Sequence, residues 1–305
     1  MAAWAGLQDS MPRAALLSIH ARVADTAPDA LDDPSLTQVW GPRFSLFVVA
    51  ERDAAIFTLG RYPSDGRGRR VAEAAAELIR KAIGEDRIAY GQAGAELGVP
   101  PNSLRYGTTT GMVRLRWEGA RAPKIWVVPR PEITATEAQL ELARRYLHVY
   151  GPTTPAAFSK WAGVGTTDGP RAFDGLAKEI LSVSTPIGAA WILAADETAI
   201  RATAAPPAKA RLLPSGDSYW LYHGRDREIL VEDAKLRDLL WTSRVWPGAV
   251  LVGGEIAGTW RRDGANLSVQ PWRRLSSAER EAVAAEAAGL PLPGIQGSIT
   301  VRWDA

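Results

Sequence analysis

Apolar and charged positions recur with a helical period over residues 70–82, "RVAEAAAELIRKA". Apolar side chains return every three or four positions and charged ones fill the opposite side, which predicts an amphipathic helix. The next segment, "YGQAGAELGVPPNSLRYGTTTG", predicts a short helix over 92–97, a glycine and proline turn, and a second helix with Asn102 as its N-cap. "MVRLRW" and "KIWVV" then predict a β-hairpin around the basic tip "EGARAP". This order of elements is typical of a winged helix.

The same order of elements returns about sixty residues later, and such recurrence constrains the architecture more than any single element. "EAQLELARRYLHVYG" predicts an amphipathic helix. Thr154 then stands as an N-cap before Pro155 at the first position of a short helix. "DGPRAFDGLAKEI" predicts the next helix, and "LSVSTPIGAAWILAAD" predicts a second hairpin. We therefore predict two winged helices in tandem.

Both ends of the chain add further elements. A helix over 12–24 and the strands "TQVW" and "FSLFVVA" predict an incomplete winged helix, which begins without its first helix. "PPAKARLLPSG" is typical of a linker into strands such as "AVLVGGEIAGTW", a helix capped by Ser276 or Ser277, and a last strand "SITVRW". The predicted fold class is α+β, with tandem winged helices followed by a C-terminal α+β unit. The predicted domains are residues 1–65, 66–132, 133–205 and 206–305.

Composition limits the classes of protein that this chain can represent. With 305 residues, 46% of them hydrophobic, it can bury a substantial core. No run reaches the roughly 18 apolar residues of a membrane span, and "MAAWAGLQDSMPR" lacks the layout of a secretory signal, so we expect a cytoplasmic protein. There is no cysteine, and the three histidines stand far apart, which predicts no metal site.

Charge is distributed unevenly, although the formal net charge is only +2. Residues 1–60 contain four Arg against seven Asp and Glu, whereas residues 61–130 contain thirteen Lys and Arg against seven Asp and Glu. Because contacts to phosphate are local, this excess favours a nucleic-acid surface. A solvated basic face without a partner is the alternative interpretation.

Five segments resemble the winged-helix DNA-binding domain family that includes the AlkZ/YcaQ-type DNA glycosylases: "GLQDSMPRAALLSIHARV", "VWGPRFSLFVVA", "ARRYLHVYGPTTPAAFSKWAG", "RLLPSGDSYW" and "VLVGGEIAGTWRR". The resemblance extends over nearly the whole chain. It implies tandem winged helices curled around duplex DNA and excision of alkylated purines. It also implies no cofactor, because a positioned water hydrolyses a glycosidic bond without metal or nucleotide.

The resemblance further implies a catalytic motif, Gln-x-Gln or Gln-x-Asp, in the segment that matches "GLQDS". Gln8 matches its first position, Ser10 stands at its second, and the nearest carboxylate is Asp9. An amide and a carboxylate suit this chemistry, since the reaction needs a positioned water and support for an oxocarbenium-like transition state. In the alternative interpretation Asp9 and Ser10 only begin a helix as caps, which leaves Gln8 unexplained.

We predict duplex DNA as the partner. Helix-turn-helix and hairpin positions supply six candidate contacts: Arg43, Arg105, Arg114, Arg116, Arg121 and Lys124. Three classes of function remain open: a monofunctional glycosylase for alkylated bases, a non-enzymatic DNA-binding or regulatory relative, and a structural or protein-interaction module. The pattern leaves the lesion, the sequence preference and the oligomeric state open.

Overall fold

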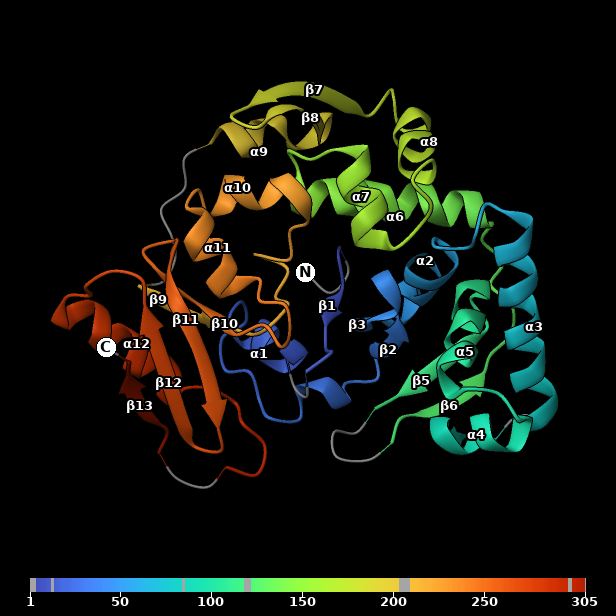
Figure 1. The fold of residues 1–305 in the computed structure, drawn as a ribbon, viewed down its shortest axis with the longest axis horizontal. Coiled ribbons are helices and arrows are strands. Elements are labelled where there is room, and N and C mark those ends of the chain that lie inside the picture. Colours follow the sequence, from blue (N-terminus) through green and yellow to red (C-terminus); the bar gives the residue numbers. More distant parts are fainter. Residues whose placement is uncertain are drawn as a thin grey trace. The chain divides into compact units, whose positions relative to one another are not determined.

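The computed structural model describes residues 4–11, 14–83, 86–117, 122–202, 209–295 and 298–304. The chain forms two compact units (Figure 1). The first unit consists of residues 1–10, 34–199 and 222–224. The second unit consists of residues 11–33, 200–221 and 225–305. Together they form a mixed α+β fold.

A six-stranded antiparallel sheet is the framework of the first unit. In spatial order its strands are β1 (Leu7–Gln8), β3 (Leu46–Ala50), β2 (Leu36–Trp40), β5 (Val113–Arg116), β6 (Lys124–Val127) and β4 (Ile88–Ala89). Gln38 of β2 pairs with Leu115 of β5. The strands near the N-terminus and the predicted hairpin of the next repeat therefore share one sheet, a pairing between distant segments that has no local sequence signal.

Helices between β2 and β6 cover this sheet (Figure 1). They are α2 (Ala54–Leu59), α3 (Gly66–Ile83), α4 (Tyr90–Leu97), α5 (Pro101–Leu104) and the 3-10 helices η2 (Pro42–Phe44), η3 (Glu51–Asp53) and η4 (Arg105–Thr110). Ile79, Leu104 and Ile125 are fully buried in their common core. The prediction for Asn102 was wrong, because α5 begins at Pro101 with Pro100 at the N-cap position.

A second group of elements completes the first unit. It comprises α6 (Ala135–Tyr150), α7 (Pro155–Ala162), α8 (Asp168–Gly175), the hairpin of β7 (Ile180–Thr185) and β8 (Gly188–Leu193), η5 (Ala194–Asp196) and α9 (Glu197–Arg201), in which the chain passes to the second unit. The cap at Thr154 and Pro155 at the first position of α7 are confirmed, since the Thr154 hydroxyl accepts the Ala157 amide. The predicted helix over 168–180 ends earlier, at Gly175.

The second unit contains a five-stranded sheet with α12 (Ser277–Ala288) in its core. The strand order is β13 (Thr300–Trp303), β12 (Asn266–Pro271), β11 (Glu255–Asp263), β10 (Gly248–Val252) and β9 (Ala210–Leu213). Its other helical segments are α1 (Ala14–His20), η1 (Ala30–Asp32), η6 (Gly224–Asp226), α10 (Arg227–Leu230) and α11 (Ala234–Leu240). The predicted cap of α12 is confirmed as a reciprocal capping box between Ser276 and Glu279.

Helix α1 belongs to this second unit, and Leu17 lies in the same hydrophobic core as Val250 and Val283. It is shorter than the predicted helix over 12–24, and Pro12 lies outside the described residues. The chain near the N-terminus thus contributes to both units. The four predicted domain ranges stay a prediction.

Within the part of the chain that the structure describes, no helix combines the length and the apolar character that crossing a bilayer requires.

Gly98 follows α4 and Gly163 follows α7, and alanine substitutions at these two positions measure how closely α7 packs against η2. Gly98 and Gly163 both have positive φ, but a Cβ at Gly98 would meet nothing within 4 Å, whereas one at Gly163 would lie 2.9 Å from Arg43 Cα. We expect Gly98→Ala to lower the free energy of unfolding by about 1–2 kcal/mol from backbone strain alone. Gly163→Ala should cost about 1–3 kcal/mol more, from overpacking.

Urea titration followed by tryptophan fluorescence measures both losses. Equal losses in the two variants would contradict the close packing of α7 on η2.

Candidate functional site

Strand β1 determines the directions of the side chains in "QDS". Leu7 pairs with Val48, Gln8 pairs with Phe47, and the Asp9 amide continues the ladder to the Leu46 carbonyl at 2.8 Å. Successive side chains of a strand point to opposite faces. Gln8 is accordingly half-buried, Asp9 is buried and Ser10 is exposed. The exposure of these three residues thus agrees with an extended chain at Gln8.

The amide of Gln8 is held by Arg43. Nη2 of Arg43 donates to Oε1 of Gln8 at 3.1 Å. A guanidinium has donors and no acceptor, so the atom that it contacts must be the amide oxygen, and this fixes which way the Gln8 amide is turned. In the described part of the chain, Nε2 of Gln8 has no hydrogen-bond partner. Gln8 therefore presents a hydrogen-bond donor.

Arg43 is itself fixed by an unusual turn and by α7. Both Arg43 and Phe44 adopt left-handed backbone conformations, with φ of 55° and 57°. Side chains other than glycine rarely adopt such angles, and strain of this kind is often found at functional sites. Nη1 of Arg43 donates to the Trp161 carbonyl at 2.8 Å, near the end of α7. One guanidinium thus links the end of α7 to Gln8.

Asp9 lies on the other side of β1, away from Gln8. Its carboxylate is 3% exposed and lies 3.4 Å from Nε2 of Gln38, whose Oε1 accepts the Trp117 amide at 2.6 Å. The strand register explains this placement. Val48 of β3 pairs with Gln38 on one side and with Leu7 on the other, and Asp9 is two residues after Leu7, on the same side of the sheet. The structure therefore brings Gln8 and Arg43 together and separates Asp9 from them.

The predicted DNA contacts occupy different environments. Arg105 begins η4 and is half-buried, with its guanidinium 5.4 Å from the centre of the Phe44 ring. Arg116 and Lys124 lie opposite each other in the hairpin of β5 and β6. Arg114 is 7% exposed and donates to the Gly111 carbonyl at 2.8 Å, and burial lowers the pKa of its guanidinium. A phosphate contact of Arg114 stays a prediction, and its burial weighs against it. Arg121 lies outside the described residues.

Arg61 is a buried cation of this site that the sequence did not predict. Its side chain is 3% exposed, and Nε donates to the Ala162 carbonyl at 2.7 Å and Nη1 to the Trp40 carbonyl at 3.1 Å. Its guanidinium lies over the Phe44 ring, 4.3 Å from the centre. Nothing in the sequence around Arg61 distinguishes it from the exposed arginines that follow, because its role depends on residues far away in the chain.

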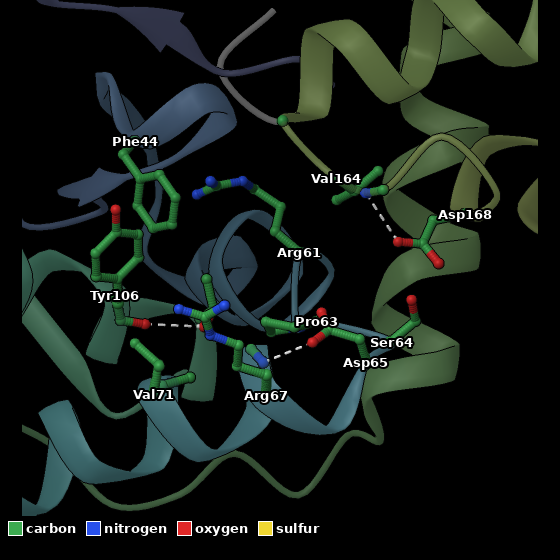
Figure 2. A pocket seen from close by; sticks show the side chains of 15 residues that line it. Phe44, Arg61, Pro63, Ser64, Asp65, Arg67, Val71, Tyr106, Val164 and Asp168 are labelled. Carbon is green, nitrogen blue, oxygen red and sulfur yellow. Dashed lines mark hydrogen bonds between the residues drawn. The ribbon is translucent and has the colours of Figure 1, made fainter.

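A pocket opens beside Phe44 and Arg61 (Figure 2). Its volume is about 380 Å³, and its walls come from η2, the segment after α2, the start of α3, η4 and the loop between α7 and α8. Figure 2 shows the Arg61 guanidinium pointing toward the Phe44 ring, with Tyr106 beside that ring. Among the described residues, no cluster of three or more His, Asp or Glu side chains is arranged to hold a metal ion.

Comparison with known proteins identifies the family. The sequence model described as "DNA glycosylase AlkZ-like" matches residues 1–291, so the chain belongs to the AlkZ-like DNA glycosylase family. The resemblance of the sequence to this family is thereby confirmed.

Two related molecules come from Streptomyces sahachiroi. The chain is 29% identical over 168 residues to an interstrand DNA cross-link repair glycosylase, an alignment that covers 53% of this chain and 43% of the relative. The chain thus spans less than half of that relative's length. The solved structure of the DNA glycosylase AlkZ is similar in fold, with a TM-score of 0.77 and 19% identity over 98% of this chain and 91% of that one.

Burial of Asp9 indicates a contribution to stability that Gln8 and Ser10 do not share. Removing the partner of a buried donor costs about 1–3 kcal/mol, whereas changes at exposed positions usually stay within about 0.5 kcal/mol. We expect Asp9→Ala to lower the free energy of unfolding by about 1–3 kcal/mol, with Ser10→Ala as the exposed control. Urea titration at pH 7 measures both. An Asp9→Ala variant as stable as the wild type would contradict a structural role for this carboxylate.

Proposed function

We propose that this protein is a monofunctional DNA glycosylase that binds duplex DNA and excises alkylated purines, with Gln8 positioning the attacking water. The observation that carries the proposal is the Gln8 amide, held through its oxygen by Arg43 and left with a donor that no other described group uses. Membership of the AlkZ-like DNA glycosylase family supports the assignment to base excision. The cross-link repair glycosylase of S. sahachiroi, a relative by sequence, supports DNA as the substrate.

The chemistry requires little more than a placed water. A purine alkylated at N7 carries a positive charge, so it leaves as a neutral base without needing a strong acid from the protein. The sugar develops oxocarbenium character as that bond breaks, and a water must stand ready at its anomeric carbon. Nε2 of Gln8 donates to one lone pair of this water and fixes its position, while Arg43 prevents the amide from turning. The other lone pair forms the new bond to the anomeric carbon as the bond to the base breaks, and the proton that the added water loses passes to solvent. No cofactor takes part in this mechanism.

The scaffold of the proposal is a pair of winged helices in tandem. The first would consist of α3, α4, α5 with η4, and the β5 and β6 hairpin, and the second of α6, α7, α8, and the β7 and β8 hairpin. Each has the order of helix, helix-turn-helix and hairpin. The solved AlkZ structure, which shares the fold, is consistent with this arrangement.

Contacts to the DNA backbone would come from cations near the first of these winged helices. Arg116 and Lys124 stand directly opposite each other across the two strands of the hairpin, so both cations lie on one short stretch of it. Arg105 begins η4, which extends α5 as the second helix of the helix-turn-helix. The role of Arg43 in the proposed function is to hold Gln8 and not to contact the DNA. Arg61, which also donates to a carbonyl at the end of α7, is a further residue of the proposed site.

A second candidate function is DNA binding without catalysis. It is favoured by the position of Asp9, whose carboxylate contacts Gln38 and not the side of β1 that carries Gln8. Ser10 then stands where the family motif places an amide or a carboxylate. Such a protein would retain the scaffold and recognise DNA in a regulatory role.

Base release from a duplex that contains a 7-alkylguanine separates these two functions. We expect Gln8→Ala to slow release about 100-fold or more, the typical effect of removing one positioned donor, while duplex binding stays unchanged. Gln92→Ala is the matched control, because Gln92 is an exposed glutamine on α4. Release is scored as strand cleavage at the abasic site after alkali. A wild-type protein that binds this duplex and releases no base would exclude the glycosylase and leave the second function.

The salt dependence of duplex binding tests the hairpin contacts. Each neutralised phosphate contributes about 0.9 to the slope of log affinity against log salt concentration. We expect Arg116→Ala with Lys124→Ala to weaken binding and to reduce that slope by about 2. Arg80→Ala with Lys81→Ala removes the same charge from α3, where both cations pair with Glu77, and is the matched control. Equal slopes for both double variants would rule out phosphate contacts by this hairpin.

A further inference from the structure

Two arginines beside the Phe44 ring have no counter-ion among the described residues, and one of them lines the pocket. Arg61 lines the pocket, and its Nη2 is buried without a hydrogen-bond partner. Nε of Arg105, next to the same phenyl ring, is also buried without a partner. Among the described residues, neither guanidinium forms an ion pair. Buried charge of one sign is unfavourable unless an opposite charge or further hydrogen bonds compensate it.

The positive charges around Arg61 add to the need for an anion at this place. Burial first, and then the positive charges of Arg43 and Arg105, lower the pKa of the Arg61 guanidinium to about 9. The Phe44 ring offers its face to both Arg61 and Arg105, and this stabilises cations only in part. An anion at this place would compensate the repulsion among the three guanidinium groups.

The carboxylates that line the pocket do not serve as that anion. Oδ1 of Asp65 accepts the Gly68 amide at 2.8 Å, in the first turn of α3. Asp168 is 2% exposed, accepts the Gly165 amide at 3.0 Å and pairs with Arg171 at 3.1 Å. Both carboxylates are therefore engaged in local caps and pairs. Figure 2 shows each of them bonded within its own segment.

We propose that this pocket binds one phosphate of a nucleic-acid backbone, with Arg61 as the buried donor in its lining, Arg67 as the exposed one, and Arg105 as a further cation beside the Phe44 ring of its wall. A phosphate has several acceptor oxygens and can receive donors from different directions. The start of α3, an 18-residue helix, lines the same pocket and adds the positive end of its dipole. A volume of about 380 Å³ leaves room for the sugar joined to the phosphate.

This site would fix the DNA strand relative to Gln8, and to that extent the inference rests on the proposed function. Phe44 lies in the pocket wall and directly follows Arg43, which holds Gln8. Arg61 binds the Ala162 carbonyl next to the Trp161 carbonyl that Arg43 binds. A phosphate at Arg61 would thus be held by the same end of α7 that orients the candidate catalytic amide.

The test is a titration of the protein with ¹⁵N-labelled arginine, observed through the Nε–H resonances by NMR. The probes are inorganic phosphate and the dinucleotide TpT, which carries a single phosphodiester. We expect the resonances of Arg61 and Arg105 to shift with both probes, while that of Arg114 stays unchanged. Arg114 is an internal control, because its Nε is also buried and unpartnered, but it neither lines the pocket nor lies over the Phe44 ring as Arg105 does. Arg61→Lys assigns the Arg61 resonance.

Two exposed arginines of α3 provide variants that keep the fold. Arg67 lines the pocket and Arg70 does not. We expect Arg67→Ala to weaken binding of TpT about three- to tenfold and Arg70→Ala to leave it unchanged. Absence of any shift at Arg61 with either probe would overturn the proposal, and so would equal weakening by both variants. A response to inorganic phosphate alone would overturn the assignment to a nucleic-acid backbone.

The same titration separates this inference from the proposed function. Should the wild-type protein bind TpT at Arg61 but release no alkylated base, the phosphate site stands and the glycosylase fails. Should it release the base while the Nε–H resonances of Arg61 and Arg105 do not shift, the glycosylase stands and the phosphate site fails.

Discussion

Helix α7 ends at Ala162, before Gly163, and two arginines from an earlier part of the chain satisfy its last carbonyl groups. Arg43 donates to the Trp161 carbonyl and Arg61 to the Ala162 carbonyl. The end of a helix exposes carbonyls that lack partners, and its dipole places partial negative charge there, so cations are favoured at this position. Because Arg43 also binds Gln8, the orientation of the candidate catalytic amide depends on where α7 ends. Gly163 permits this approach, since any Cβ there would collide with Arg43.

The turn that brings these arginines to α7 is strained. Arg43 and Phe44 both have positive φ, and glycines at both positions would remove the strain. Glycines would also remove the guanidinium that holds Gln8 and the ring that lies over Arg61. The surrounding hydrogen bonds and packing must therefore stabilise a local conformation that is unfavourable by itself. Strain and buried charge occur together at this turn, and this agrees with the binding role that we propose for it.

Local signals predicted the helices and the hairpins well, and non-local contacts account for the rest. The caps at Thr154 and Ser276 were predictable because a cap involves residues within one turn of the helix. The pairing of β2 with β5 depends on segments far apart, and α1 packs in the second unit against residues more than 190 positions later in the chain, such as Leu212 and Val250. Gln8 was predicted from a resemblance to a family, whereas its partner Arg43 was predicted only as a DNA contact. Arg61 carried no signal, because only the fold buries it.

The direction of β1 also limits what chemistry "QDS" can perform. Side chains alternate with a period of two residues along β1 and Asp9, whose amide continues the ladder, so Asp9 points away from Gln8, and Ser10 is the exposed residue that follows. The two polar residues of the family motif, Gln-x-Gln or Gln-x-Asp, stand two positions apart. Asp9 stands only one position after Gln8, so its side chain points to the opposite face and cannot take the role of the second motif residue. A serine at the second position of the motif would supply a neutral hydroxyl, which adds no negative charge beside a developing oxocarbenium. A site of this kind, under the proposed function, depends on the positive charge of the alkylated base to make it a good leaving group. It should therefore favour cationic purine adducts over neutral damaged bases.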